Sequence, residues 1–219
     1  ADLEAEDFVR KILVDGLRIV GLCVGYAFGF GKGRRGNPDL LQALAPAAGF
    51  WLEVIPPVSQ DGLVVSSRMI RALLAEGKVT EAQRFLGRPF CLTGEVQPGA
   101  GRGRELGFAT ANVPLPEPPP LLDGVYAGRV RVRGDFRDAM MNLGRAPTFG
   151  PGERRLEIHM PGWDEPLYGE RIVAFFLRRL RDEQRFPDAG ALAAQLAKDR
   201  EAAEAVWQAA RGLPWPEWA

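Results

Sequence analysis

Hydrophobic and polar positions follow two different rhythms along the chain. Near the start, helical spacing around Phe8 and Ile12 precedes a short apolar run, Ile19–Val24, which predicts a buried strand. A glycine-rich loop, 25–36, leads to a predicted helix at Pro38–Ala48 with proline in its first turn. Further strands are expected at Phe50–Ile55 and Leu63–Val65, and further helices at Met69–Ala75 and Thr80–Phe85. This alternation of strand and helix predicts a parallel sheet with crossover helices.

After about Gly87 the rhythm changes to short alternating runs punctuated by glycine and proline. The runs lie at 90–96, 126–132, 156–160 and 171–177. Several short strands with turn signals between them predict an antiparallel barrel or sandwich. The proline-rich segment 114–120 is expected to be a loop. A last helix is predicted from Asp188, as its cap, to Arg211, with Gly212 ending it.

The change of rhythm predicts two domains. Residues 1–86 are expected to form an α/β remnant, and residues 87–219 an antiparallel β-barrel with a C-terminal helix. Basic and acidic residues balance at 28 each, which argues against a nucleic-acid partner. The longest apolar run, 19–30, is broken by glycine and too short for a membrane span, and no signal peptide is visible. We therefore expect a soluble, cytoplasmic protein without a membrane partner.

Cysteine and histidine are scarce. Cys23 and Cys91 lie far apart in apolar stretches, without metal-binding spacing, and are expected to be buried free thiols. His159 is the single histidine, so a multi-histidine metal site within these residues is excluded.

The segment from Gly99 to Asn112 combines glycines, arginines and oxygen-bearing side chains. Glycines at alternate positions let backbone N–H groups surround a phosphate. Thr110 and Asn112 lie two apart on an extended strand, so their oxygens share one face, and such hard ligands suit Mg²⁺. From the residues alone, a glycine-rich hairpin with solvated arginines is the alternative. The residues of the predicted site are Gly99, Gly101, Arg102, Gly103, Thr110 and Asn112.

The same segment resembles the riboflavin kinase signature, Gly-Phe-Pro-Thr-Ala-Asn, with Ala109 in place of the proline that would fix the backbone dihedral. The resemblance covers nearly all of residues 87–205. It implies transfer of the γ-phosphate of ATP to the 5′-hydroxyl of riboflavin, giving FMN. It also implies that the Gly99–Asn112 residues bind ATP and that Thr110 and Asn112 hold Mg²⁺. Other blocks that match in order are Leu86–Phe90, Gly124–Ala127, Asn142–Phe149, Leu156–His159, Leu167–Gly169 and Leu180–Phe186.

Glu157 and His159 are two apart on one predicted strand and therefore face the same side. From the residues alone, they are a surface carboxylate and a satisfied histidine. The resemblance implies that Glu157 is the catalytic base, which accepts the proton of the attacking hydroxyl. His159 is expected to support the strand. Arg181 is a flavin-site candidate by the same resemblance, and a salt-bridged connector is the alternative.

Two N-terminal blocks, Val24–Gly36 and Ser66–Arg71, resemble the FMN adenylyltransferase module of bacterial bifunctional FAD synthetases, which is a Rossmann-like nucleotidyltransferase. The resemblance implies that Ser66, Ser67 and Arg71 bind ATP phosphates at a helix N-terminus. Alanine occupies the acidic position, at Ala27. The module's His-x-Gly-His motif is absent from these residues, so we expect this chain to make FMN and a longer parent chain to convert FMN to FAD.

Two other classes of protein remain open from the sequence. A catalytically impaired flavin- or nucleotide-binding barrel is favoured by Ala109 and Ala27, which depart from the family patterns. A nucleic-acid-binding barrel would use Arg102 and Arg104, but the zero net charge opposes it. Turnover that requires both ATP and Mg²⁺ separates the enzyme from either binding module.

Overall fold

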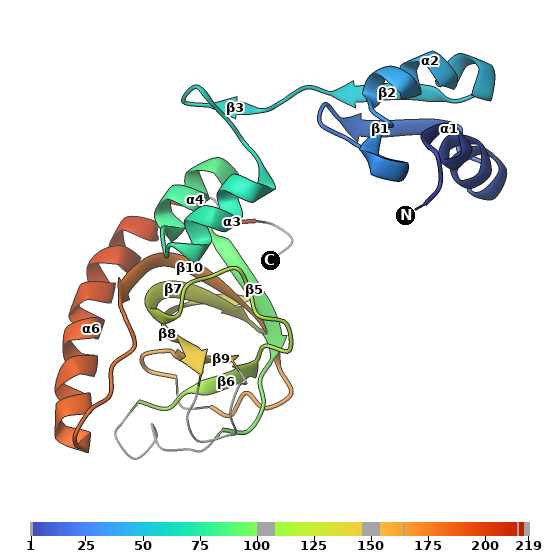
Figure 1. The fold of residues 1–219 in the computed structure, drawn as a ribbon. Coiled ribbons are helices and arrows are strands. Elements are labelled where there is room, and N and C mark those ends of the chain that lie inside the picture. The colour runs from blue at the N-terminus through green and yellow to red at the C-terminus, as the bar shows by residue number, and fades with distance from the viewer. Residues whose placement is uncertain (1, 100–107, 146–153, 164, 214, 217–219) are drawn as a thin grey trace. The chain divides into compact units, whose positions relative to one another are not determined.

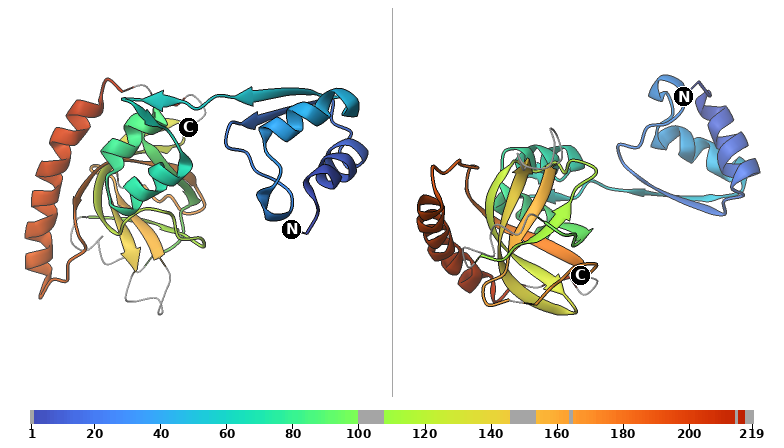
Figure 2. Two further views of the ribbon diagram at one scale, coloured as in Figure 1. Left: turned by 45° about the horizontal axis from the view of Figure 1, so that its top comes forward. Right: turned by 90° about the horizontal axis from the view of Figure 1, so that it is seen from below.

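A computed structural model describes the chain except for residues 1, 100–107, 146–153, 164, 214 and 217–219. The chain divides into two compact units, Ala1–Val65 and Ser66–Ala219 (Figures 1 and 2). Within the described ranges, no helix is both long and apolar enough to cross a membrane.

The first unit places helices beside a pair of parallel strands. Asn37 caps the second helix by accepting a hydrogen bond from the backbone N–H of Leu40 at 2.9 Å, and Gly49 ends it with φ of 78°. The two strands run in parallel from the Gly21–Trp51 pair to the Gly25–Ile55 pair, so the predicted α/β character is confirmed. The elements are α1 (Ala5–Asp7), the π-helical η1 (Phe8–Gly16), β1 (Gly21–Gly25), the 3₁₀ turn η2 (Lys32–Arg34), α2 (Pro38–Ala48) and β2 (Trp51–Ile55).

The prediction that a third strand joins this parallel sheet is wrong. Leu63 instead belongs to β4 (Leu63–Val64), which pairs antiparallel with β3 (Ser59–Gln60) in a two-residue hairpin. The turn is Asp61-Gly62, and both residues have positive φ, 52° and 76°. An Asp-Gly pair in this conformation closes tight hairpins. These turn residues therefore favour a local antiparallel hairpin over a third strand of the parallel sheet.

The prediction that both thiols are buried is wrong for Cys23, which is exposed on β1. Its thiol donates a hydrogen bond to Glu53 Oε2 on the neighbouring strand at 3.4 Å. That hydrogen bond is the main cause that raises the pKa of Cys23. Cys91 is partly buried, as a residue of the barrel.

The second unit is a six-stranded antiparallel sheet in the order β5-β10-β7-β8-β9-β6, with helices at its margins (Figure 1). A bridge between Gln97 and Asn112 joins the two edges of the sheet, so it curls into a half-barrel. The predicted antiparallel barrel with a C-terminal helix is confirmed. The elements are α3 (Ser67–Ala75), α4 (Val79–Leu86), β5 (Phe90–Glu95), β6 (Ala111–Pro114), β7 (Gly124–Val132), β8 (Asp135–Arg145), β9 (Arg154–His159), β10 (Arg171–Arg181) and α6 (Ala189–Ala210).

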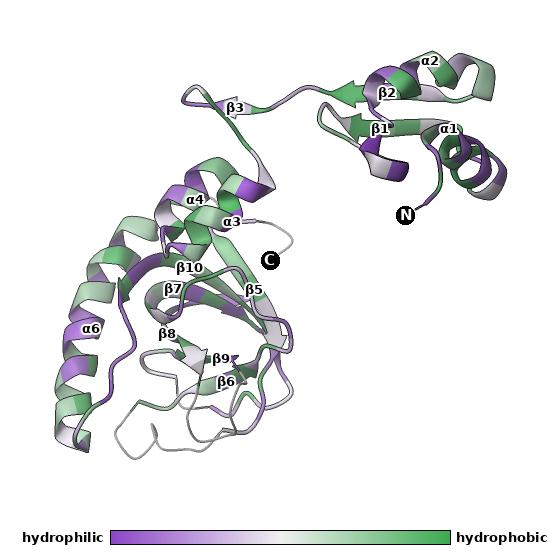
Figure 3. Cartoon of the chain, viewed as in Figure 1, coloured by the Kyte–Doolittle hydropathy of each residue, from purple (hydrophilic) through white to green (hydrophobic). Residues whose placement is uncertain are grey.

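The two faces of this sheet have different partners. Tyr126, Met141 and Ile158 are fully buried in the main core on the inner face. Because side chains alternate along a strand, their neighbours Ala127 and Met140 point the other way. There they pack against Ala203 and Trp207 of α6, whose sequence mixes apolar and polar stretches (Figure 3). Asp188 caps α6 by accepting a hydrogen bond from Ala191 N at 2.7 Å. The helix therefore covers part of the outer face.

Helices α3 and α4 pack with the barrel. Leu74, Val79 and Ala82 belong to the same buried cluster as the strands. Thr80 also donates its hydroxyl to the backbone carbonyl of Leu177 on β10 at 3.0 Å. The compact unit that holds the barrel therefore begins at Ser66, whereas the domain boundary expected from the sequence lies between residues 86 and 87.

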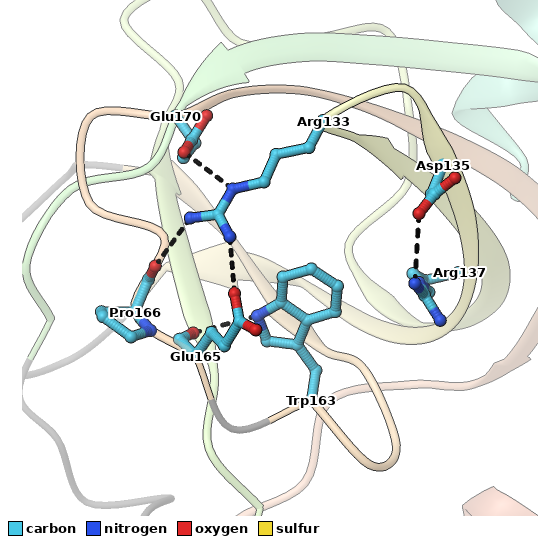
Figure 4. Close-up of polar contacts among 7 residues, drawn as sticks. All are labelled: Arg133, Asp135, Arg137, Trp163, Glu165, Pro166 and Glu170. Carbon is cyan, nitrogen blue, oxygen red and sulfur yellow. Dashed lines mark hydrogen bonds and ion pairs between the residues drawn. The ribbon is translucent and has the colours of Figure 1, made fainter.

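A polar cluster holds the turn between β7 and β8 to the loop before β10 (Figure 4). Arg133 donates to Glu165 at 2.6 Å and to Glu170 at 2.9 Å. The guanidinium groups of Arg133 and Arg137 lie over the Trp163 ring, 5.9 Å and 5.3 Å from its centre. Such cation–π contacts and ion pairs at the surface each contribute about 1 kcal/mol or less.

Candidate active site

A row of polar side chains crosses three neighbouring strands of the half-barrel. Glu157 on β9 lies opposite Asn112 on β6 and opposite Asn142 on β8. Ile158, next along β9, is buried in the inner core, so the Glu157 row occupies the outer face. Residues directly opposite in antiparallel strands have Cβ atoms about 5 Å apart. The sheet register therefore brings together three polar groups that are distant in the sequence.

Glu157 is the half-buried carboxylate at the centre of this row. Burial raises the pKa of Glu157, and the neighbouring Arg155 opposes that shift. A carboxylate with a raised pKa is a stronger base than a solvated one, because less water stabilises its charge. Its burial and its position between two amides suit a group that accepts a proton from an alcohol.

Asn142, which lies opposite Glu157 on the neighbouring strand, contacts a second carboxylate. Its side-chain Nδ2 donates to Glu183 Oε1 at 3.3 Å. Burial is the largest cause that raises the pKa of Glu183, while the Asn142 hydrogen bond lowers it and the charges of Asp123 and Glu157 raise it. By resemblance, Glu183 lies in the stretch after Arg181 that is near the flavin in the family, whereas no role was predicted for Asn142. The available signal was their position inside two blocks that resemble the family.

Thr110 and Asn112 are the predicted metal ligands. Asn112 Nδ2 lies 3.5 Å from the backbone carbonyl of Thr110, which turns its Oδ1 away from that carbonyl. A Cβ on Gly99 would come within 2.0 Å of Asn112 Nδ2, so glycine leaves the space that this amide occupies. Gly101, Arg102 and Gly103 of the predicted phosphate loop lie outside the described residues.

The donors present suit a hard cation that keeps most of its own ligands. The described residues contain no group of three or more His, Cys, Asp or Glu side chains arranged to hold a metal. Asn112 offers a neutral oxygen opposite Glu157, and Thr110 offers a second one just before β6. Mg²⁺ typically binds through few protein oxygens and completes its shell with water and substrate phosphates. The residues therefore fit Mg²⁺ bound together with a nucleotide.

His159 anchors the segment that precedes Thr110. Its Nδ1 lies 3.0 Å from the carbonyl oxygen of Ala109, and its ring packs on Phe108 with centroids 4.9 Å apart. Because a carbonyl only accepts, Nδ1 carries the proton in this contact. Burial lowers the pKa of His159, while the hydrogen bond to Ala109 opposes the shift. The neutral ring thus fixes the backbone next to the predicted metal ligands.

Arg181, the flavin-site candidate, is engaged with the C-terminal helix. Its guanidinium donates to both carboxylate oxygens of Asp199, with Nη2 2.7 Å from Oδ2. Asp199 is 3% exposed and also accepts a hydrogen bond from Gln195 at 2.9 Å. This geometry is that of a structural ion pair. The flavin-binding role of Arg181 stays a prediction.

Ser66, Ser67 and Arg71 lie exposed in the first turns of α3. The Ser66 hydroxyl accepts a hydrogen bond from the backbone N–H of Met69 at 3.3 Å and caps the helix. All three residues belong to the compact unit that holds the barrel. Their role in binding ATP for adenylyl transfer stays a prediction.

This fold and site define an enzyme domain: an antiparallel half-barrel with a C-terminal helix and a half-buried carboxylate beside oxygen donors. A sequence profile described as "Riboflavin kinase" matches residues 86–207, and one described as "FAD synthetase" matches residues 1–69. The chain belongs to the riboflavin kinase family.

Relatives and a solved structure extend this likeness over most of the chain. The bifunctional riboflavin kinase/FMN adenylyltransferase of Pseudomonas fluorescens is 40% identical over 205 residues, 93% of this chain and 66% of that protein. The Escherichia coli K12 protein of the same name is 36% identical over 91% of this chain and 64% of its own length. A crystal structure named "Macrolide-efflux Protein from Streptococcus pneumoniae" matches with a TM-score of 0.76 and 29% identity, over 93% of this chain and 66% of that one. The chain spans just under two thirds of the length of these relatives.

Proposed function

We propose that the chain is a riboflavin kinase, which transfers the γ-phosphate of ATP to the 5′-hydroxyl of riboflavin and produces FMN and ADP. The observation that carries the proposal is the position of Glu157, half-buried and in register between Asn112 and Asn142 in a riboflavin kinase half-barrel. Enzymes that transfer phosphoryl groups act mainly by positioning and by neutralising charge. A single well-placed base beside oxygen donors meets that need.

The reaction balances around Glu157. Its carboxylate accepts the proton of the 5′-hydroxyl while that oxygen bonds to the γ-phosphorus. The bond from the γ-phosphorus to the bridging oxygen breaks, and ADP leaves with the electron pair. Mg²⁺, when bound, neutralises phosphate charge, and Thr110 and Asn112 would hold it. His159 keeps the Thr110 segment in place through the Ala109 carbonyl.

The contact between His159 and the Ala109 carbonyl also bears on the alternative function, a barrel that binds flavin or nucleotide without turnover. Ala109 lacks the ring that would restrict the backbone before Thr110. The hydrogen bond from His159 restrains the same residue from outside, at 3.0 Å. This restraint on Ala109 supports the enzyme over the binding module.

For the N-terminal residues we propose a part in FMN adenylylation within a longer protein. The profile match to FAD synthetase covers residues 1–69, and the relatives that match are bifunctional. The 219 residues contain one histidine, His159 in the barrel, and so lack the paired histidines of the adenylyltransferase motif. We therefore propose that this chain makes FMN and not FAD.

The test is the dependence of riboflavin consumption on its co-substrates. The purified chain is incubated with riboflavin alone, with ATP, with Mg²⁺, and with both. Consumption of riboflavin only in the last mixture supports the kinase. Binding of riboflavin without consumption in any mixture contradicts it and leaves a binding module.

A further inference from the structure

Arg133 fastens the turn between β7 and β8 to the segment that precedes β10 (Figure 4). Its Nη1 donates to Glu165 Oε2 at 2.6 Å, and its Nε donates to Glu170 Oε1 at 2.9 Å. Its Nη2 donates to the backbone carbonyl of Pro166 at 3.4 Å. A guanidinium presents its donors in a rigid fork, so one side chain can bind several acceptors at once. Arg133 therefore restrains Glu170, the last residue before β10.

Glu170 is also paired through its backbone with the end of β5. Its carbonyl accepts a hydrogen bond from Val96 N at 2.9 Å, and Gly169 N donates to the Val96 carbonyl at 2.9 Å. Val96 directly follows β5 and is 1% exposed. These hydrogen bonds continue the pairing of β5 with β10 beyond its last ladder pair, Glu95 with Arg171. The side chain of Arg133 and the backbone of Val96 thus restrain the same residue.

The residue after Val96 contacts a predicted metal ligand. Gln97 N donates to the backbone carbonyl of Asn112 at 2.8 Å, in the bridge that joins the two edges of the sheet. A Cβ on Gly99 would come within 2.0 Å of Asn112 Nδ2, so the chain after Gln97 runs directly past the Asn112 amide. The position of that amide therefore depends on the course of the segment after β5.

Arg137 offers a comparison within the same cluster. The guanidinium groups of Arg133 and Arg137 both lie over the Trp163 ring. Arg137 donates to Asp135, two residues away on its own strand, at 3.2 Å. Arg133 instead reaches Glu170, which is 37 positions away. The two arginine side chains are 42% and 50% exposed, so replacing either one leaves the buried core intact.

We propose that Arg133 is a positioning residue for nucleotide binding: through Glu170 it fixes the segment that holds Asn112 at the predicted Mg²⁺ site. This inference rests on the proposed function and deepens it. Arg133 acts at a distance, through the carboxylate of Glu170 and the backbone hydrogen bonds that follow it. The register of β9 on β8, which sets Glu157 opposite Asn142, does not involve this connection. The effect therefore falls on the nucleotide and spares riboflavin.

The test measures KM for ATP and KM for riboflavin in matched variants. Arg133 has a φ of 52°, and asparagine adopts such a left-handed backbone readily. Arg133→Asn therefore removes the guanidinium and keeps the turn. Arg137→Asn removes the other guanidinium over Trp163 and is the control. Arg133→Lys keeps a positive charge that can reach one of the two carboxylates.

We expect KM for ATP to rise by about 3- to 5-fold in Arg133→Asn, as for loss of exposed charge contacts, while KM for riboflavin and kcat change by less than about 2-fold. Arg133→Lys should recover part of the loss, and Arg137→Asn should resemble the unmodified chain. A purely structural role would affect both substrates, or both arginine positions, equally. Either of these results overturns the inference.

A double-mutant cycle tests whether Arg133 acts through Glu170. Glu170→Ala removes the carboxylate and keeps the backbone that pairs with Val96, and it should also raise KM for ATP. Because both changes break the same ion pair, the double variant should have the KM of Arg133→Asn alone. If the two effects multiply, they are independent and the connection through Glu170 is overturned.

The same variants are compared in the dissociation constant of ADP with Mg²⁺, measured by calorimetry. This arm separates the two claims. If the unmodified chain does not phosphorylate riboflavin, the proposed kinase activity fails. The dissociation constants still decide about Arg133: weaker binding by Arg133→Asn than by Arg137→Asn supports the inference. Equal binding by the two variants, or no binding by the unmodified chain, overturns it.

Discussion

Arg181 at the end of β10 and Asp199 in α6 form a bidentate ion pair, with Nε–Oδ1 and Nη2–Oδ2 distances of 2.9 Å and 2.7 Å. Their side chains are 14% and 4% exposed. The pair joins the last strand of the half-barrel to the helix that covers its outer face, close to the segment that carries Glu183. It is therefore a structural support of the barrel unit.

Replacing Asp199 by alanine should destabilise the barrel unit strongly. The change leaves the Arg181 guanidinium buried without its partner, which typically costs about 3–5 kcal/mol. Urea unfolding followed by tryptophan fluorescence gives the free energy. The matched control is Glu204→Ala, which removes an exposed ion pair with Arg200 on the same helix and should cost under about 1 kcal/mol. Equal losses in the two variants would contradict the structural role.

Gly128→Ala should also destabilise the barrel unit. A Cβ there would lie 2.1 Å from the backbone oxygen of Phe175 and 2.2 Å from Met141 Cε. Because one of these atoms is backbone, relief requires strand movement, at about 1–3 kcal/mol. Gly212→Ala is the control, since a Cβ at Gly212 meets no atom within 4 Å. The prediction fails if both variants unfold at the same urea concentration.

The pH dependence of catalysis should reflect the burial of Glu157. The ordinary pKa of glutamate is about 4.3. The pKa of Glu157 is raised above that value, so the ionised base is lost as pH falls through the higher pKa. The acid limb of kcat/KM against pH should lie above that range. Lys or Arg in place of Asn142 would lower the pKa of Glu157 and move the limb to lower pH. A limb at or below pH 4.3 in the unmodified chain would contradict this account.

The same shift has a consequence for stability, with the opposite sign from a salt-bridged carboxylate. A group with a raised pKa in the folded state binds more protons folded than unfolded between its two pKa values. The free energy of unfolding contributed by Glu157 therefore decreases as pH rises through that window. Glu157→Gln should flatten this slope in unfolding measured across acidic pH. An unchanged slope would show that burial of Glu157 does not affect its proton affinity.

His159 should act on nucleotide binding through the Ala109 carbonyl. Removing its donor in His159→Ala frees the segment before Thr110, so KM for ATP should rise by about 3- to 10-fold, as for loss of one hydrogen bond. KM for riboflavin should change less. His159→Asn, whose amide can donate to the same carbonyl, should recover part of the loss. Equal effects of both variants on both substrates would indicate general loss of structure.

Local sequence signals predicted most of the elements in the structure. Asn37, Pro38 and Gly49 mark the ends of α2, and Asp188 marks the start of α6. The strand β8 (Asp135–Arg145) escaped prediction because the alternation that begins at Asp135 breaks at Asp138, which directly follows Arg137. Its pairing with β7 and β9 on both sides supplies what the local pattern lacks.

The candidate site was only partly predictable from the sequence. Glu157 and Asn112 lie in blocks that resemble the family, and the sheet places them opposite each other. The Asn142–Glu183 contact joins residues 41 positions apart and depends on register across the sheet. No periodicity within either segment encodes that contact, so it required the structure.

The central claim is tested most directly by conversion of riboflavin with ATP and Mg²⁺, with FMN and FAD separated by chromatography. The unmodified chain, Glu157→Ala and the control Glu201→Ala are compared under the same conditions. The account predicts FMN without FAD from the unmodified chain and the control. Glu157→Ala should be slower by about 100-fold or more, as for loss of a general base. Formation of FMN by Glu157→Ala at the unmodified rate would contradict the assignment of the base, and absence of FMN from the unmodified chain would contradict the kinase.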